Sequence, residues 1–332
     1  MKNRCAAIVL TLALCSCGGG SPTAPSTPAP PSTGISAAAQ AYLDQLFNVM
    51  QANSINRQTI DWASFRQSVV AAAGNAQTIA NLSPAISTAL GLLGDHHSYF
   101  IRPDGSYILN PTSPGCSLDP AAPTPTVPAD IGYVQVGAIS GSVEEKQRYA
   151  IAMQDAIRAA DSTALSGWIV DVRGNSGGSM WPMLAGIGPV LGEGTLGFFV
   201  DPNGKTVSWE YRAGMSLLDG QAVTTVPSPY TPLRPGARVA VLTDRRVASS
   251  GEATVIAFRG RPNTRSFGAA TCGLSTSNGG FTMSDGAQLV LTNTVMADRM
   301  GNRYGVPVPP DEFITDPAEA VQRAIRWLRG GM

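Results

Sequence analysis

From residue 131 onward the chain alternates between short apolar runs and helical patterns, and this alternation limits the folds open to it. Residues 167–172 and 238–243 are rich in β-branched and aliphatic side chains, as strands buried on both faces are. The first run leads through a glycine-rich turn into a helical pattern that begins at Met180, and the second leads into one over residues 250–258. Such alternation predicts an α/β core whose strands are partly parallel.

Earlier in the chain the pattern is helical and then irregular. Apolar residues recur at helical spacing within residues 36–93, where Asp61 is expected to cap a helix. Residues 101–130 are rich in Pro, Ser and Thr, and we expect a long loop with room for one strand. The folded part therefore divides into an N-terminal helical region (36–100), a Pro-rich loop (101–130) and the α/β core (131–332).

The first residues have the features of an export signal. Two basic residues precede an apolar run that ends at Leu14 and is too short to span a bilayer. The Leu-Cys-Ser-Cys sequence that begins there resembles a lipobox, in which Cys17 would carry the lipid; an ordinary cleaved signal is the alternative. After this signal peptide (1–17), residues 18–35 are almost entirely Gly, Ser, Thr, Pro and Ala, so we expect a disordered tether. The pattern predicts an exported protein, lipid-anchored in a bacterial cell envelope on the periplasmic face or the cell surface.

Composition limits the partners and cofactors. The 332 residues carry 23 basic and 23 acidic side chains, so we expect no basic surface that would attract nucleic acid. The two histidines are adjacent, and neither a third histidine nor a cysteine cluster completes a metal site. We therefore expect no metal, no other cofactor and no nucleic acid. Outside the signal, Cys116 and Cys272 could form a disulfide in an oxidising compartment; Cys272 as a nucleophile is the less favoured alternative.

A first segment with chemical potential is the histidine pair. It lies in the sequence Asp-His-His-Ser at residues 95–98, where the helical region ends. Histidine is the usual general base near neutral pH. Taken alone, however, such a pair is more often structural.

Two further segments contain residues that suit acyl transfer. Asp171 begins a strand-to-helix turn that ends in Gly177 and Gly178, and their N–H groups could face an oxyanion or simply form the turn. Ser249 begins a helix, where the helix dipole favours developing negative charge. The same Ser249 forms a capping box with Glu252, which needs no catalysis.

In their order along the chain, these segments resemble the tail-specific (C-terminal processing) proteases, peptidase family S41. The resemblance spans residues 93–311 and implies a ClpP/crotonase-like β-β-α core, a serine-peptidase activity and peptide or protein substrates. It rests on residues 95–98, 171–178, 249–252 and 268–273 and on the closing Gly305-Val306 and Pro310-Asp311.

The resemblance assigns roles to individual residues. Ser249 matches the family nucleophile, and the N–H of the neighbouring Ser250 would be one oxyanion donor. A second donor would come from Gly177 or Gly178. His97 matches the base of the tricorn-like branch of the family.

The resemblance also indicates how the base is chosen and oriented. A lysine base, used by another branch, is not expected, because its position is Leu274 and no lysine follows Lys205. The glutamate that orients the machinery in the tricorn-like branch is matched by Asn302, with Asp298 as a nearby substitute. Asparagine can orient a neutral imidazole but stabilises imidazolium less.

The loop over residues 101–130 is too short for a PDZ module, so recognition of a substrate C-terminus by such a module is not expected.

The sequence leaves three functions open. The main prediction is a peptidase that acylates Ser249 with His97 as general base. The alternative is a catalytically weak or inactive binder of a peptide or lipid on the same fold. A structural surface lipoprotein would explain the tether but not the ordered motifs.

Overall fold

The computed structural model describes residues 34–116 and 120–331. The predicted signal peptide, Cys17 and residues 18–33 of the predicted tether therefore lie outside the described residues. At the end of the predicted tether, Ile35 packs against the helical core. The folded region thus begins slightly before the predicted boundary. Among the described residues, no helix has both the length and the apolar character needed to cross a bilayer.

The N-terminal region is helical, as predicted. Ser36 accepts a hydrogen bond from the Ala39 N–H at the start of the first helix, and Asp61 caps the second by accepting from Ala63 and Ser64. The elements are α1 (Ala37–Asn53), α2 (Trp62–Ala73), the 3₁₀ turn η1 (Ile79–Leu82) and α3 (Ser83–Leu92).

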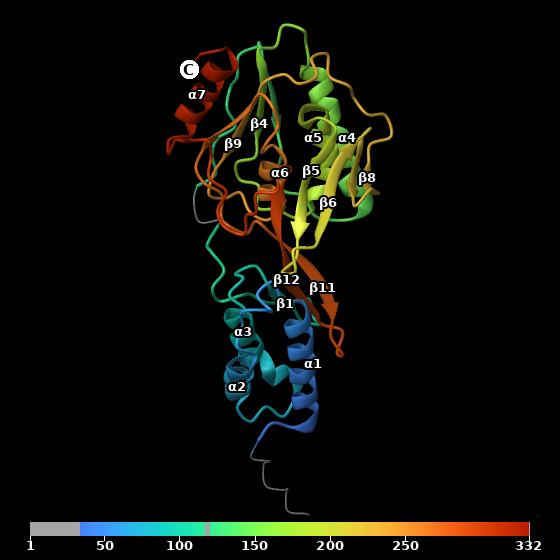
Figure 1. The fold of residues 1–332 in the computed structure, drawn as a ribbon, viewed down its shortest axis with the longest axis vertical. Helices are drawn as coiled ribbons and strands as arrows, with labels where there is room; N and C mark the ends of the chain where they lie inside the picture. The colour runs from blue at the N-terminus through green and yellow to red at the C-terminus, as the bar shows by residue number, and fades with distance from the viewer. Residues whose placement is uncertain (1–33, 117–119, 332) are drawn as a thin grey trace, which may run out of the picture. The chain divides into compact units, whose positions relative to one another are not determined.

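A five-stranded parallel sheet forms the centre of the α/β core. Alternate residues of its strands face opposite sides: Ile169 and Ala240 pack against α7, whereas Val170 and Val241 face α4, α5 and α6. Figure 1 shows α7 on one side of β4 and β9 and α4 and α5 on the other. The strand order is β13 (Glu312–Phe313), β10 (Thr264–Gly268), β9 (Val239–Thr243), β4 (Gly167–Asp171) and β3 (Ile131–Gln135). The helices are α4 (Val143–Ala160), α5 (Met180–Leu191), α6 (Ser250–Ala257) and α7 (Pro317–Leu328).

A second, antiparallel sheet was not anticipated from the sequence. It consists of β1 (Tyr99–Ile101), β2 (Tyr107–Ile108), β5 (Gly194–Val200), β6 (Thr206–Arg212), β7 (Met215–Leu218), β8 (Gln221–Thr225), β11 (Thr276–Thr282) and β12 (Gln288–Asp298). The long strand β12 pairs with β1 at one end and with β5 at the other, while β11 runs along its opposite edge. This strand therefore connects the segment after the histidine pair to the α/β core.

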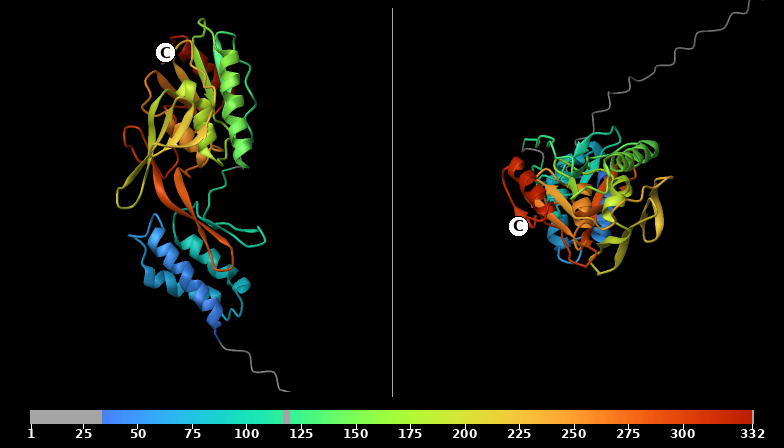
Figure 2. Two further views of the ribbon diagram at one scale, coloured as in Figure 1. Left: turned by 90° about the vertical axis from the view of Figure 1, so that its right-hand side faces the viewer. Right: turned by 90° about the horizontal axis from the view of Figure 1, so that it is seen from above.

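The β11–β12 hairpin also completes the helical region. Figure 2 shows it extending from the core to the N-terminal helices. Its apolar residues Met283, Ala287, Leu289 and Leu291 are buried in one cluster with the apolar faces of α1, α2 and α3. Because a C-terminal segment fills part of this core, residues 36–100 do not bury their apolar surface alone.

The expected fold class is confirmed. The chain has a mixed α/β fold with a parallel sheet, helices on both of its faces and an N-terminal helical region. Cys116 and Cys272 form a disulfide with a Cα–Cα distance of 5.3 Å. A disulfide-bonded Cys272 has no free thiolate, so the alternative in which it serves as a nucleophile is wrong for this state.

Candidate active site

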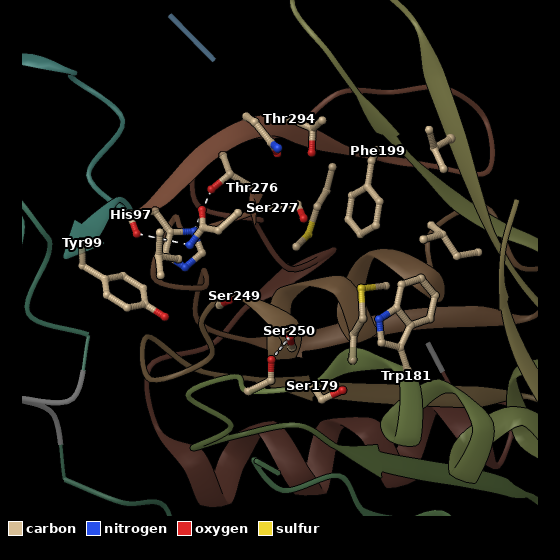
Figure 3. A pocket seen from close by; sticks show the side chains of 18 of the residues that line it. His97, Tyr99, Ser179, Trp181, Phe199, Ser249, Ser250, Thr276, Ser277 and Thr294 are labelled. Atoms are coloured by element: carbon tan, nitrogen blue, oxygen red, sulfur yellow. Dashed lines mark hydrogen bonds between the residues drawn. The ribbon is translucent and has the colours of Figure 1, made fainter. Parts of the chain in front are cut away.

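A cavity of about 720 Å³ brings together residues from both halves of the chain. Ser249 and Ser250 at the start of α6 line it, together with Gly178 of the glycine turn. His97 lines it from the segment before β1 (Figure 3). The structure therefore places the predicted nucleophile, base and one predicted oxyanion glycine around a single cavity.

Ser249 has a strained backbone. It connects β9 to α6 with φ 54° and ψ −118°, a conformation that non-glycine residues rarely adopt. Its N–H donates to Glu252 Oε2 at 2.9 Å, which is half of the predicted capping box. Sharp strand-to-helix turns of this kind expose a serine hydroxyl in many hydrolases.

The glycine turn packs directly against this strained serine. The Asn175 carbonyl accepts from the Ala248 N–H at 2.9 Å. A Cβ on Gly177 would lie 2.9 Å from Ser249 Cβ, and a Cβ on Gly251 would lie 2.4 Å from the Asn175 carbonyl oxygen. Only glycine fits this close approach at both positions.

The two candidate oxyanion glycines differ in their hydrogen bonds. The Gly177 N–H donates to Asn175 Oδ1 at 2.9 Å, so it is already engaged. Within the described residues, the N–H groups of Gly178 and Ser250 have no protein acceptor. The Ser250 hydroxyl donates to the Gly178 carbonyl at 2.8 Å and ties the two segments together. Gly178 and Ser250, rather than Gly177, are therefore placed to donate to a ligand.

The two adjacent histidines lie in a tight turn that the Asp95 side chain holds. The Asp95 carboxylate accepts from the N–H groups of His97 and Ser98 and from the Ser98 hydroxyl. His96 has φ 62°, and its Nδ1 lies 2.7 Å from Thr112 Oγ1, away from the cavity. Of the two histidines, only His97 lines the cavity together with Ser249.

The His97 ring is fixed by β11. Its Nδ1 lies 2.8 Å from Thr276 Oγ1, and its carbonyl accepts from Asn278 Nδ2 at 3.3 Å. Burial lowers the pKa of His97 to about 4, and the nearby Asp95 charge opposes this shift only in part. The imidazole is therefore neutral at pH 7 and able to accept a proton.

The structure does not bring Asp298 or Asn302 to His97, which corrects the expected orienting role. Asp298 is 2% exposed and accepts from the Asn302 side chain, the Tyr304 hydroxyl and backbone N–H groups after β12. Neither residue lines the cavity. Thr276 Oγ1 lies next to His97 Nδ1 instead, and its local sequence gave no signal because its place depends on the pairing of β11 with β12.

Glu252 connects the turn at Ser249 to the segment that contains Cys272. Its side chain is fully buried and accepts from Thr271 Oγ1 at 2.5 Å and from the Gly273 N–H at 2.9 Å, in addition to Ser249. Burial raises its pKa to about 7 despite these hydrogen bonds. The residues on either side of Cys272 are thereby connected to the Ser249 backbone.

The cavity walls are apolar on one side and polar on the other. The polar side comes mainly from β11 and β12, with Thr276, Ser277, Asn278, Asn293 and Thr294. Lys146 of α4 also lines the cavity, whereas no carboxylate does. Within the described ranges, no group of three or more His, Cys, Asp or Glu could hold a metal ion. The apolar and aromatic lining residues are Tyr99, Met180, Trp181, Phe199, Val207, Leu218, Val290 and Met296.

Comparisons with known proteins identify the family of the chain. The model of peptidase family S41 matches residues 130–313. A nisin-resistance protein from Lactococcus lactis subsp. lactis is 25% identical over 291 residues, which is 87% of either chain.

Two solved structures share the fold. A lipoprotein from Streptococcus agalactiae matches with a TM-score of 0.67 and 23% identity, over 90% of this chain and 98% of that one. The photosystem II D1 C-terminal processing protease matches with a TM-score of 0.56 and 15% identity, over 87% of this chain and 97% of that one. Both similarities extend over the helical region as well as the α/β core.

Proposed function

Because the chain belongs to peptidase family S41, we propose that it is a serine peptidase with Ser249 as nucleophile and His97 as general base. One observation supports this most strongly. A strained serine at a helix start and a neutral, partly buried histidine, far apart in sequence, line the same cavity. A binding protein would need the cavity but not the strained serine.

The proposed reaction follows from the positions of these groups. Ser249 Oγ attacks the substrate carbonyl carbon while His97 Nε2 takes the hydroxyl proton. The N–H groups of Gly178 and Ser250 stabilise the oxyanion. The C–N bond then breaks and His97 gives its proton to the leaving amine. Water attacks the resulting ester with His97 again as base, which releases the acid and restores Ser249.

Thr276 acts in this proposal as the positioning residue for His97. Its hydroxyl lies 2.8 Å from Nδ1 and can accept from an Nδ1–H, and in that tautomer Nε2 is the proton acceptor. A hydroxyl stabilises imidazolium less than a carboxylate does. We therefore expect slower acylation than in a triad with a buried carboxylate.

Labelling with a serine-reactive fluorophosphonate tests the assignment. The wild-type chain should be labelled and Ser249→Ala should not, whereas Ser250→Ala keeps its N–H and should retain labelling. His97→Ala should slow labelling by roughly 10²- to 10⁴-fold, the usual contribution of a general base. Lys146→Met is included because Lys146 also lines the cavity.

Each other outcome has a defined meaning. Labelling that survives Ser249→Ala refutes the nucleophile. Labelling lost in Lys146→Met but kept in His97→Ala identifies the lysine as the base, contrary to the proposal. No labelling of a folded wild-type protein favours the alternative of an inactive peptide or lipid binder.

We also propose that the protein acts in the cell envelope with a lipid on Cys17. The signal-like sequence and the similarity to a protein described as a lipoprotein support this location. The relative named for nisin resistance supports a peptide as the substrate. Membrane fractionation tests the anchor, since Cys17→Ala should move the protein to the soluble fraction.

A further inference from the structure

Lys146 is a cation without a counter-charge at the candidate active site. It lies in the first turns of α4, is partly buried and lines the cavity. Within the described residues, its ammonium group has neither a hydrogen bond nor an ion pair. The neighbours at helical spacing, Ser142, Val143, Tyr149 and Ala150, carry no carboxylate that could pair with it.

The cavity itself supplies no negative charge. None of the residues that line it is an aspartate or a glutamate. His97 is neutral at pH 7, so the Lys146 ammonium is the formal charge that the cavity wall presents. A ligand carboxylate would meet a cation in a site that partly excludes water, where such pairs are stronger than at an open surface.

The backbone that carries Lys146 is fixed in place. The next residue, Gln147, donates from Nε2 to the Thr225 carbonyl at 3.2 Å, and the Tyr149 hydroxyl donates to the Gly137 carbonyl at 2.8 Å. These bonds attach the first turns of α4 to β8 and to the loop after β3. The flexible lysine stem can therefore reach a ligand from an anchored base.

An apolar wall lies in the same cavity. Trp181 and Phe199 meet edge to face with their ring centroids 6.4 Å apart (Figure 3). Phe199 also stacks on the buried Trp209, with a centroid distance of 5.7 Å. Val207 and Leu218 extend this surface. The wall suits an apolar side chain, because burying one releases water from both surfaces.

We propose that Lys146 is a substrate-recognition residue that binds a carboxylate of the peptide, next to an apolar side chain seated on the Trp181–Phe199 wall. The carboxylate is either an Asp or Glu side chain or the free C-terminus. The inference deepens the proposed peptidase function by naming its substrate class. It does not depend on which residue is the base.

Binding to the inactive Ser249→Ala chain separates recognition from catalysis. The probes are fluorescein-labelled, C-terminally amidated alanine peptides that contain one leucine and one glutamate. Across the set, the glutamate occupies in turn each position before and after the leucine. Each has a matched glutamine peptide. A further pair differs only in a free or amidated C-terminus. Fluorescence anisotropy gives the dissociation constants.

At least one acidic peptide should bind roughly tenfold more tightly than its neutral partner, as expected for a partly buried charge pair. Lys146→Gln should reduce this ratio to near one, and Lys146→Glu should invert it, so that the glutamine peptide binds more tightly than its glutamate partner. Lys205→Gln is the matched control, because Lys205 is an exposed lysine in the turn before β6. The peptide pair whose affinities differ shows whether Lys146 binds a side-chain carboxylate or the C-terminal carboxylate. In 1 M NaCl the preference for the acidic peptide should weaken.

Two results would overturn the inference. One is an acid preference that persists unchanged in Lys146→Gln while thermal melts show the variant to be folded. The other is the absence of any charge-dependent binding. Failure of the catalytic proposal is visible separately, because it appears in the fluorophosphonate experiment and leaves the anisotropy ratios unaffected.

Discussion

Ser249 has a backbone conformation that helix capping does not require. The serines that cap α1 and α4, Ser36 and Ser142, have φ of −65° and −67°, in the extended region usual for N-caps. Ser249 has φ 54° at the same structural position, at a cost of about 1–3 kcal/mol. The capping box with Glu252 is therefore compatible with catalysis but does not explain this strain.

His97 determines the acid side of the pH dependence. Because its pKa is lowered to about 4, the neutral base persists well below the ordinary histidine value of about 6.5. Glu252 also titrates in this range, because burial raises its pKa to about 7, so the test uses Glu252→Gln. In that variant the rate of fluorophosphonate labelling should stay nearly constant from pH 7 to pH 5 and fall as the pH drops through about 4. A fall centred near pH 6.5 in Glu252→Gln would contradict the lowered pKa of His97.

Thr276 gives this prediction a matched pair of variants. Thr276→Val removes the hydroxyl at Nδ1 and should slow labelling by roughly tenfold to a hundredfold, because the ring loses its orientation. Thr276→Ser keeps the hydroxyl and should restore most of the rate. Equal rates in the two variants would show that the hydroxyl does not position His97.

At the scale of elements, the glycine turn between β4 and α5 must approach α6 closely. Gly177→Ala adds a Cβ 3.0 Å from the Ala248 carbonyl oxygen and 3.3 Å from the Ser250 nitrogen, in a residue with φ 107°. We expect the turn to move away from Ser249 and labelling to fall by roughly 10²-fold or more, as when an oxyanion donor is lost.

Gly194→Ala is the control for this substitution. Gly194 has a similar φ of 114°, but a Cβ there has no atom within 4 Å. Both variants should lose stability through the unfavourable φ, which a thermal melt measures. A similar loss of labelling in both would mean that backbone strain, and not the contact with Ser249, causes the effect.

The strand β12 explains how the distant segments meet. Tyr99, two residues after His97, pairs with Val290, and Asp298 at the other end pairs with Gly197 of the core. Thr276 at the start of β11 pairs with Val295 between them. One long strand, β12, thus connects the segment that carries His97 to the core that carries Ser249.

At the scale of the whole molecule, the disulfide joins Cys116 of the Pro-rich loop to Cys272, whose two neighbours in sequence donate to Glu252. The two cysteines are 156 residues apart in sequence. A cross-link that closes so long a loop restricts the unfolded chain. The double variant Cys116→Ala/Cys272→Ala should lower the free energy of unfolding by about 2–4 kcal/mol, measured by denaturant titration.

Reduction provides the control. Dithiothreitol should destabilise the wild type by a similar amount and leave the double variant unchanged. Because Thr271 and Gly273 donate to Glu252, the variant should also be labelled more slowly at Ser249. An unchanged free energy of unfolding would show that the cross-link does not restrict the unfolded state.

The sequence by itself determined the local parts of this protein. The buried strands β4 and β9, the helices α4 and α6 and the Asp61 cap follow from residue periodicity and backbone preferences, which act over a few residues. The order of the motifs also indicated Ser249 and His97, because each motif can be identified from the residue types within a single segment.

Only the tertiary structure decided what surrounds those residues. The antiparallel sheet, the orienting contact from Thr276 and the position of Lys146 depend on pairing between segments far apart in the chain. The resemblance to the family led to Asn302, with Asp298 as a substitute, but the turn after β12 uses both for its own hydrogen bonds. Side-chain neighbours are set by strand register and packing, and neither is encoded within a single motif.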